Sequence, residues 1–547
     1  MKTAHLTRTW NFNMKFKDIL LGIALVLASL GSFNLLAQTT QPILTQPIVY
    51  ERSHKDSDHS FLIISMGVKG LALIRDTEKF EGGKKNWEVI FLDSALNESW
   101  ATKIEIDPRM NILGHDYRDG NIYLIFEEPE NPGRQINLTE IILSERMVKQ
   151  HKFKPDVNIH YTHFSVLKNK AVFGGYMMKE PTILLYDLTN EATKVIPGTF
   201  AVKEELMDLR NNSNDTFNAL LIERESKTIK KLIVRTYDSN GVLLVDDVIA
   251  IDEDKTIIEA ISSALVRDEL VVMGTWTYGG SKSAAGIFSV MVDPFNEQKV
   301  NYYDFAELNH FLDYFKPKKA AKLKAKADWR KSVGKQPEFR AHLYPIKIEE
   351  SKEGFILLGE VYDPPNNNSF RSSPYGYSPY NFNSYNPYGF SPYGYPPYRY
   401  SSPYSYGYPY TTNSSINDTR MIHSSLIFFN DHGMLVSDQS LKFPEIKLAS
   451  KEQVSDFINL DKRTVMVCKQ EKEILAQINE SDGTVIQAEK IVPALKNQNE
   501  SVKSDSDETA IRFWYGRYFY VHGYHRVKNS IEKDTRNVFY INKIRVD

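Results

Sequence analysis

The sequence predicts an all-β protein, a β-propeller of about eight four-stranded blades, with seven blades as the alternative. Two observations predict this fold. Short runs of β-branched and aromatic residues recur along the chain, and many are followed by turns that begin with Asp or Asn. These turns return in steps of about fifty residues, which is the spacing expected of propeller blades.

The apolar runs have the length and composition of strands. Examples are residues 61–64, 122–126 and 183–186, which consist of Ile, Leu, Phe and Tyr. Gly, Asn, Asp or Pro residues lie close to the ends of such runs, as they commonly do around β-strands. We therefore expect mostly strands along the mature chain.

The turns repeat one motif: Asp or Asn, then two to four residues that often include Gly, then another strand. Asn, Asp and Gly tolerate the positive backbone angles of tight turns, so the motif predicts β-hairpins. It begins at Asp93, Asp187, Asp238, Asp293, Asn430 and Asn479, with a weaker member near Ser144.

Each step between these hairpins also holds two earlier strands, which makes a four-stranded unit. The units begin near His59, Met110, His160, Glu205, Thr256, Phe339, Gln453 and Thr509. The last unit is one strand short, and the strand-like residues 42–50 are expected to supply its outer strand and close a ring over residues 42–547. The alternative is two separate β-domains with an ordinary N-terminal arm.

Two insertions interrupt the spacing. Residues 305–335 have a helical pattern whose second half is strongly basic, and residues 364–415 form a low-complexity segment of Tyr, Pro, Gly and Ser. The first lies between two units and the second lies between the second and third strands of the next unit. Because an antiparallel chain reverses direction at every turn, both insertions are expected on one face of the ring.

That face is the candidate binding surface, where cationic side chains opposite tyrosines could make cation–π contacts. The alternative is a solvated helix face beside a disordered loop. Deletion of residues 366–410 is the test of an adhesive or partner-binding role for the Tyr-rich segment. The candidate binding residues are Lys318, Lys319, Lys322, Lys326, Arg330, Tyr375, Tyr377, Tyr393 and Tyr395.

The first 37 residues are predicted to be a signal peptide, and translation could begin at Met14. A basic stretch, an apolar run over residues 19–36 and a cut after Ala37 suit export to the periplasm or cell surface. An uncleaved membrane anchor is the alternative, since the run is about 27 Å long as a helix. The single cysteine, Cys468, is far from the cleavage site and excludes a lipoprotein and an intramolecular disulfide.

Charge gives no overall attraction to nucleic acid or to an anionic membrane. The chain has 67 basic and 69 acidic residues, a net charge of -2 and a pI near 6.7. The expected partners are therefore a protein or glycan of the envelope, with no nucleic acid, and with a membrane only if the signal segment is uncleaved.

No motif predicts a catalytic, cofactor or metal site. His160 with His163, and His522 with His525, are spaced three apart, which on a strand places them on opposite faces. Residues 274–286 are Gly-rich but lack the frame of a phosphate loop and lie between two strands. Cys468 is expected to be a buried core residue.

Three stretches carry a resemblance: residues 284–288, residues 339–360, and residues 517–523 together with 538–544. Through them the sequence resembles exported β-propeller-like proteins of Gram-negative bacteria that have no assigned function. The resemblance implies export and the propeller fold, and it implies no activity. The Tyr-rich segment departs from the family pattern.

The sequence therefore predicts a non-enzymatic binding or scaffolding protein of the bacterial periplasm or cell surface. The alternative is an envelope hydrolase or lyase that acts on glycan or peptide at the propeller channel. Converging carboxylate, His or Arg side chains at the channel mouth would favour the enzyme.

Overall fold

A computed structural model describes residues 43–547 except 56–57, 129–133, 179, 197–203, 226–227, 266–268, 294, 296–297, 338, 365–387, 390–418, 449–450, 461–462, 481, 483 and 506–508. The predicted signal segment and nearly all of the Tyr-rich segment lie outside the described residues. The chain divides into residues 1–45 with Asp547 and residues 46–546. The second unit is the propeller.

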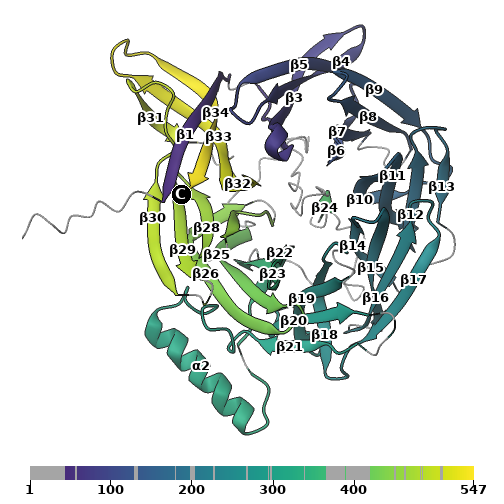
Figure 1. The fold of residues 1–547 in the computed structure, drawn as a ribbon, viewed down its shortest axis with the longest axis vertical. Coiled ribbons are helices and arrows are strands. Elements are labelled where there is room, and N and C mark those ends of the chain that lie inside the picture. Colours follow the sequence, from purple (N-terminus) through teal and green to yellow (C-terminus); the bar gives the residue numbers. More distant parts are fainter. Residues whose placement is uncertain are drawn as a thin grey trace, which may run out of the picture. The chain divides into compact units, whose positions relative to one another are not determined.

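Eight sheets are arranged around a central axis, which confirms the predicted fold (Figure 1). In each blade the first strand lies nearest the axis and the fourth lies outermost (Figure 1). Blade 1 consists of β2 (Leu62–Ser65), β3 (Leu71–Glu81), β4 (Lys84–Leu92) and β5 (Glu98–Ile106), and blade 2 of β6 (Asn111–Arg118), β7 (Asn121–Glu127), β8 (Ile136–Ile142) and β9 (Met147–Phe153). Blade 3 consists of β10 (His160–Leu167), β11 (Lys170–Met177), β12 (Glu180–Asp187) and β13 (Thr193–Val195), and blade 4 of β14 (Glu204–Asn211), β15 (Thr216–Glu225), β16 (Thr228–Asp238) and β17 (Leu243–Ala250).

The second half of the ring follows the same order. Blades 5 to 7 consist of β18 (Lys255–Ser262), β19 (Leu270–Tyr278), β20 (Gly286–Val292) and β21 (Asn301–Asp304); β22 (His342–Ser351), β23 (Gly354–Asp363), β25 (Thr419–Asn430) and β26 (Leu435–Leu448); and β27 (Ser455–Leu460), β28 (Arg463–Gln470), β29 (Glu473–Glu480) and β30 (Val485–Ile491). Blade 8 contains β32 (Ala510–Tyr515), β33 (Tyr518–Asn529) and β34 (Thr535–Val546), and β31 (Glu500–Asp505) also pairs with β33.

The ring is closed by the N-terminal strand. β1 (Leu44–Ser53) pairs with β34 and completes blade 8, as the sequence predicts. Several contacts then join blade 8 to blade 1; for example, the indole N–H of Trp514 donates to the carbonyl of Gly70 at 3.3 Å, and the Tyr50 hydroxyl donates to Glu98 at 2.7 Å. Without β1, β34 would present an unpaired edge.

The repeated Asp/Asn motif forms the turn between the third and fourth strands of a blade. Asp93 accepts hydrogen bonds from the backbone N–H groups two and four residues later, at 2.8 and 2.9 Å. Asp238 and Asn430 make the same pair of bonds. In these last two turns Gly241 and Gly433 have positive φ angles, 72° and 69°. The side-chain acceptor thus explains the choice of Asp or Asn.

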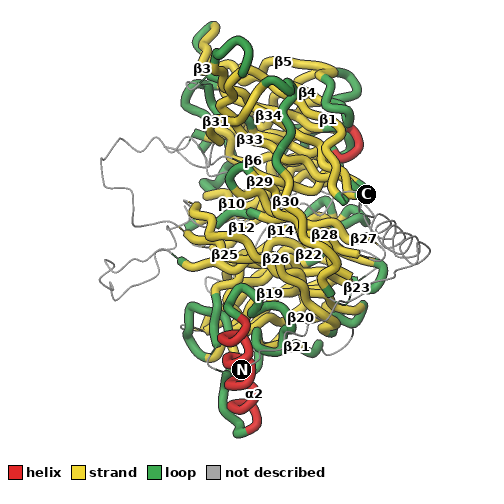
Figure 2. The backbone as a smooth tube through the Cα atoms, turned by 90° about the vertical axis from the view of Figure 1, so that its left-hand side faces the viewer, coloured by secondary structure: helices red, strands yellow, loops and turns green. Residues whose placement is uncertain are grey.

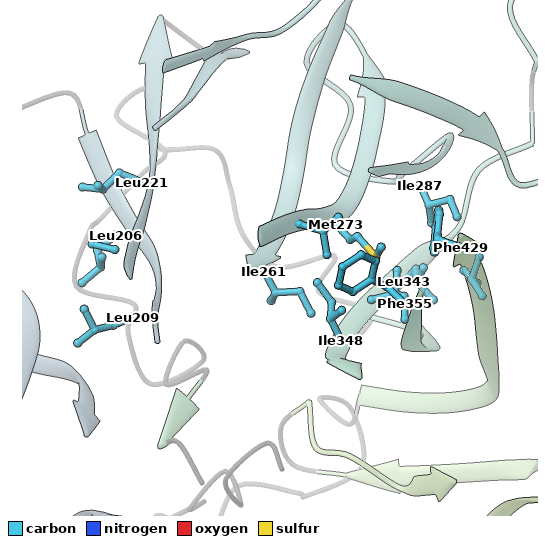
Figure 3. Packing of buried hydrophobic residues seen from close by; sticks show 14 of the residues in the cluster. Leu206, Leu209, Leu221, Ile261, Met273, Ile287, Leu343, Ile348, Phe355 and Phe429 are labelled. Atoms are coloured by element: carbon cyan, nitrogen blue, oxygen red, sulfur yellow. The ribbon is translucent and has the colours of Figure 1, made fainter. Parts of the chain in front are cut away.

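The apolar cores lie between neighbouring blades. The largest cluster includes Leu206 and Leu209 of blade 4, Ile261 of blade 5, and Leu343 and Phe355 of blade 6 (Figure 3). Other clusters join blades 1 and 2, 2 and 3, 6 and 7, and 8 and 1. Because each sheet buries both faces, the blades are held together mainly by apolar packing.

The connector between blades 5 and 6 contains α2 (Pro317–Ser332), which lies at the outer side of the ring (Figures 1 and 2). The helix is shorter than the predicted pattern over residues 305–335. Residues 305–316 are turns, because Phe305 and Phe311 stack in the core at 4.1 Å and Asp438 accepts the N–H groups of Asn309 and His310. These contacts fix a non-helical path as far as Pro317, which is well suited to begin a helix.

Two short elements complete the fold: a 3₁₀ turn, η2 (Gly67–Lys69), and β24 (Tyr388–Gly389), which pairs in parallel with β10. Within the described part of the chain, no helix has the length and apolar character needed to cross a membrane.

Candidate functional site

The first candidate site lies where blades 5, 6 and 7 meet, at the end of blade 6 that carries its connectors. We name Glu259, His342, Tyr344, Tyr362 and Lys451 the rim cluster. The ammonium group of Lys451 lies 2.8 Å from a carboxylate oxygen of Glu259. It also lies 4.9 Å from the ring centroid of Tyr362 and 5.4 Å from that of Tyr344.

The local chain path brings these residues together. His342 and Tyr344 begin β22, Tyr362 ends the adjacent antiparallel β23, and Lys451 belongs to the connector that leaves blade 6. Glu259 on β18 follows a β-bulge in its pairing with β19. A bulge re-aims the side chains beside it, so this one helps to set the direction of Glu259.

The rim cluster combines aromatic rings with one ion pair. The rings of His342 and Tyr362 are 5.4 Å apart. Burial lowers the pKa of His342, and the positive charge of Lys451 lowers it further, so the imidazole is neutral at pH 7. Tyr344 and Glu259 are buried, so the part-exposed His342, Tyr362 and Lys451 are the members of the cluster that can contact a flat or ring-shaped group.

The second candidate site is the outer face of α2. An α-helix advances about 100° per residue, so the five predicted basic residues and Trp329 fall within a sector of about 120°. Lys318, Lys319, Lys322 and Lys326 are exposed, and Arg330 is half-buried. We name this set the basic sector. The one acidic residue of α2, Asp328, lies outside it.

The opposite face of α2 attaches the helix to the propeller. Ala320 and Leu323 pack on the largest apolar cluster. Lys324 donates to the carbonyl of Asn309 at 2.6 Å, and Lys331 forms an ion pair with Glu307. Two members of the basic sector also contact the protein: Lys319 lies 3.8 Å from the ring centroid of Phe315, and Arg330 donates to the carbonyl of Gln336 at 2.7 Å. Lys324 and Lys331 are the basic residues of the helix that lie outside the sector.

The predicted pairing of these lysines with tyrosines remains a prediction. Tyr375, Tyr377, Tyr393 and Tyr395 lie outside the described residues. The two insertions do occupy the predicted positions in the chain, between blades 5 and 6 and between the second and third strands of blade 6. At the base of the Tyr-rich segment, Asp363 and Arg420 form an ion pair of 3.3 Å.

Buried carboxylates connect neighbouring blades, a feature that sequence reasoning missed. Glu360 of blade 6 accepts the backbone N–H groups of Val454 and Ser455 and the hydroxyl of Ser455, at 2.7 to 3.0 Å to its Oε1 atom. Asp116 of blade 2 accepts the N–H of Val166 in blade 3 at 2.8 Å. We name these contacts carboxylate clasps.

Two more clasps follow the same principle. Asp208 of blade 4 accepts the N–H and hydroxyl of Ser262 in blade 5, at 2.9 and 2.8 Å. Asp456 of blade 7 accepts the N–H of Phe513 in blade 8 at 2.9 Å and lies 2.8 Å from Lys347 of blade 6. These acids satisfy backbone groups that would otherwise be buried without partners.

Burial shifts the ionisation of two clasp residues. It raises the pKa of Asp116 and of Glu360 to about 7, against the opposing effect of the N–H groups that each one accepts. Perturbed carboxyl groups of this kind also occur in active sites. Here both residues accept N–H groups of the next blade, which is a structural use.

The arrangement closest to a nucleophile triad also serves as a clasp. The negative charge of Asp208 acts on His163, and Asp208 accepts a hydrogen bond from the hydroxyl of Ser262. The Ser262 hydroxyl donates to the carboxylate rather than to the imidazole, and all three side chains are buried. In a Ser-His-Asp triad the serine instead bonds to the histidine.

The other residues that the sequence singled out have structural positions. His160 is exposed while His163 is buried, so the pair does not face one side. Cys468 is fully buried in β28, and residues 279–285 form the turn between β19 and β20. No group of three or more His, Cys, Asp or Glu residues could hold a metal ion in the portion of the chain that is described.

The fold and these contacts define the chain as an eight-bladed β-propeller with clasped blades. No protein-family model matches it. No curated protein matches it in sequence.

Solved structures show weak likenesses. The polysaccharide lyase Uly1 has a TM-score of 0.36 and 7% identity, and the match covers 90% of this chain and 100% of that chain. One of two prolyl endopeptidases studied together has a TM-score of 0.39 and 8% identity, and the match covers 94% of this chain and 59% of that chain. The β-propeller domain of the Trilobed protease from Pyrococcus furiosus has a TM-score of 0.33 and 9% identity, and the match covers 80% of this chain and 96% of that chain. Likenesses at this level carry no argument about function.

Proposed function

We propose that this chain is an exported, non-enzymatic binding protein of the bacterial periplasm or cell surface. It binds a protein or glycan partner through the end of blade 6 that carries the rim cluster, the base of the Tyr-rich segment and the connector with α2. The supporting observation is the outward-facing basic sector of α2, in which four of the five cationic side chains are exposed.

The contrast with the buried acids supports this proposal. Asp116 and Glu360, whose pKa values burial raises, accept backbone N–H groups from the adjacent blade. A general acid or base must instead reach the substrate proton. The groups offered on the connector end are aromatic and cationic, which suits recognition.

Capture of partners from envelope extracts tests the proposal. The immobilised intact chain is compared with a chain lacking residues 366–410 and with the double variant Tyr362→Ala/Lys451→Ala. Glu145→Ala is the matched control, because Glu145 is exposed in a turn between third and fourth strands, at the opposite end of the blades. We expect the two altered chains to lose a captured partner that the control retains. Equal capture by all four chains would refute the proposal.

A second candidate function is an envelope hydrolase or lyase that acts on glycan or peptide. Glu259, His342 and Lys451 of the rim cluster favour it, because an acid, an imidazole and a cation lie within electrostatic range of one another. The ion pair between Glu259 and Lys451 opposes a role for Glu259 as a general base, because the carboxylate is already occupied by the ammonium group. Incubation of envelope glycan and peptide with the intact chain and with Glu259→Gln distinguishes the candidates: new products formed only by the intact chain would establish the enzyme.

A further inference from the structure

The basic sector has a charge pattern that opposes the helix dipole, although Lys319 also contacts the ring of Phe315 at 3.8 Å. Lys318 and Lys319 lie in the first turn of α2, where the helix dipole disfavours cations, and no acidic residue accompanies them. No side chain caps the N-terminus either. A helix selected only to cover the core would gain from the reverse arrangement, so the lysines indicate an external anionic partner.

The geometry of the sector is linear. From Lys318 to Arg330 it extends about 18 Å along the helix, at about 1.5 Å per residue. Trp329 lies within the same sector and is 56% exposed. A row of cations that contains an exposed aromatic ring fits a chain of charged rings, because the lysines can pair with the charges while the indole stacks on a ring face.

An anionic membrane surface fits less well. Apart from Trp329, the exposed large apolar residue at this end of the helix is Val333. Helices that lie in a membrane interface bury a broad apolar face, and the apolar residues Leu323 and Ala327 of α2 face the propeller. Nucleic acid is also a chain of charged rings, but an exported protein of the kind proposed above encounters envelope glycans rather than nucleic acid, so the choice between the two polyanions rests on the proposed function.

We infer that the basic sector binds a linear acidic polysaccharide along α2. This inference rests on the proposed binding function and names the chemical class of the partner. Lys318, Lys322 and Lys326 pair with successive carboxylates, and Trp329, which lies beyond Lys326 along the helix, stacks on the next sugar ring.

Titration of the purified chain with polygalacturonate tests the inference, with dextran as the neutral polysaccharide. The test variant carries Lys318→Gln, Lys319→Gln, Lys322→Gln and Lys326→Gln, which keep good helix formers at exposed positions. The matched control carries Gln at four exposed lysines elsewhere, Lys103, Lys152, Lys154 and Lys528. Circular dichroism verifies that both variants are folded. Trp329→Ala is measured separately.

We expect the intact chain and the control to bind polygalacturonate and not dextran. The helix variant should lose on the order of tenfold or more in affinity, with a weaker dependence on salt, because fewer counterions are released. Trp329→Ala should weaken binding at high salt as well as at low salt. Absent binding by the intact chain, or equal binding by the helix variant and the control, would overturn the inference.

Two parallel titrations decide between partner classes. Tighter binding of single-stranded DNA or of phosphatidylglycerol vesicles, with the same dependence on the four lysines, would overturn the choice of polysaccharide. Capture from envelope extracts remains a separate measurement. If partners are still captured while polygalacturonate is not bound, the inference fails and the proposed function stands; if neither occurs, both fail.

Discussion

Replacement of Glu360 by Leu should destabilise the propeller by about 3 kcal/mol or more. The substitution nearly preserves side-chain volume but removes the acceptor for two buried donors, the N–H and hydroxyl of Ser455, and for the part-buried N–H of Val454. Each buried donor left without a partner costs about 1 to 3 kcal/mol. The variant no longer buries a carboxyl group, which offsets part of this cost. The net loss of unfolding free energy is therefore expected near the lower end of the summed cost of the three donors.

Urea unfolding followed by tryptophan fluorescence measures this effect, with Glu145→Leu as the control at an exposed site. Ser455→Ala is then introduced into both backgrounds. It should cost about 1 kcal/mol in the intact protein and less beside Glu360→Leu, since its hydroxyl has already lost its acceptor. A shift for Glu360→Leu no larger than that for Glu145→Leu would refute the assignment of Glu360 as a clasp.

Three further predictions concern ionisation, closure and the connector. Burial raises the pKa of Glu360 from 4.5 to about 7. Between these two pH values the unfolded chain has released a proton that the folded chain still holds. The free energy of unfolding should therefore fall by about 3 kcal/mol as pH rises from 4.5 to 7, at about 1.4 kcal/mol per pKa unit. Glu360→Gln should lack this dependence in urea unfolding at several pH values, and parallel curves for the two proteins would contradict it. Deletion of residues 44–53 should expose the edge of β34 and produce concentration-dependent oligomers in size-exclusion chromatography with light scattering, whereas a stable monomer would speak against closure by β1. Asp438→Ala should speed amide hydrogen exchange at Asn309 and His310 and leave blade 2 unchanged, and unaltered exchange there would show that Asp438 does not hold the connector.

The blades could be predicted because their turns carry local information. The side chains of Asp93, Asp238 and Asn430 bond to their own turns, so each residue specifies a hairpin from within a few positions. Counting such turns also indicated that the last blade lacked a strand. The position of β1 followed, because a single strand was left over at the N-terminus.

The clasps could not be predicted in this way. Asp116 and Val166 are 50 residues apart, and nothing local distinguishes this acid from the other 68 acidic residues. The start of α2 was missed for a related reason. The amphipathic pattern begins near Phe305, but the stacking of Phe305 on Phe311 and the contacts to Asp438 in blade 6 decide the backbone path.

The binding face was predicted only in part. The five basic residues of α2 were identified from composition, and the helical geometry explains why they share one sector while Lys324 and Lys331 do not. Trp329 was not identified, although its spacing of seven residues from Lys322 places it on the same face. The rim cluster was missed because Glu259 and Lys451 are 192 residues apart in the chain.

Site-specific photo-crosslinking tests the binding face most directly. A photoreactive residue replaces Lys322 on the outer face of α2 or, in a second chain, Lys103 on the outer strand of blade 1. Both chains are irradiated in intact cells of the source organism. The account predicts a crosslinked partner from position 322 and none from position 103. The same products from both positions, or a product from 103 alone, would contradict it.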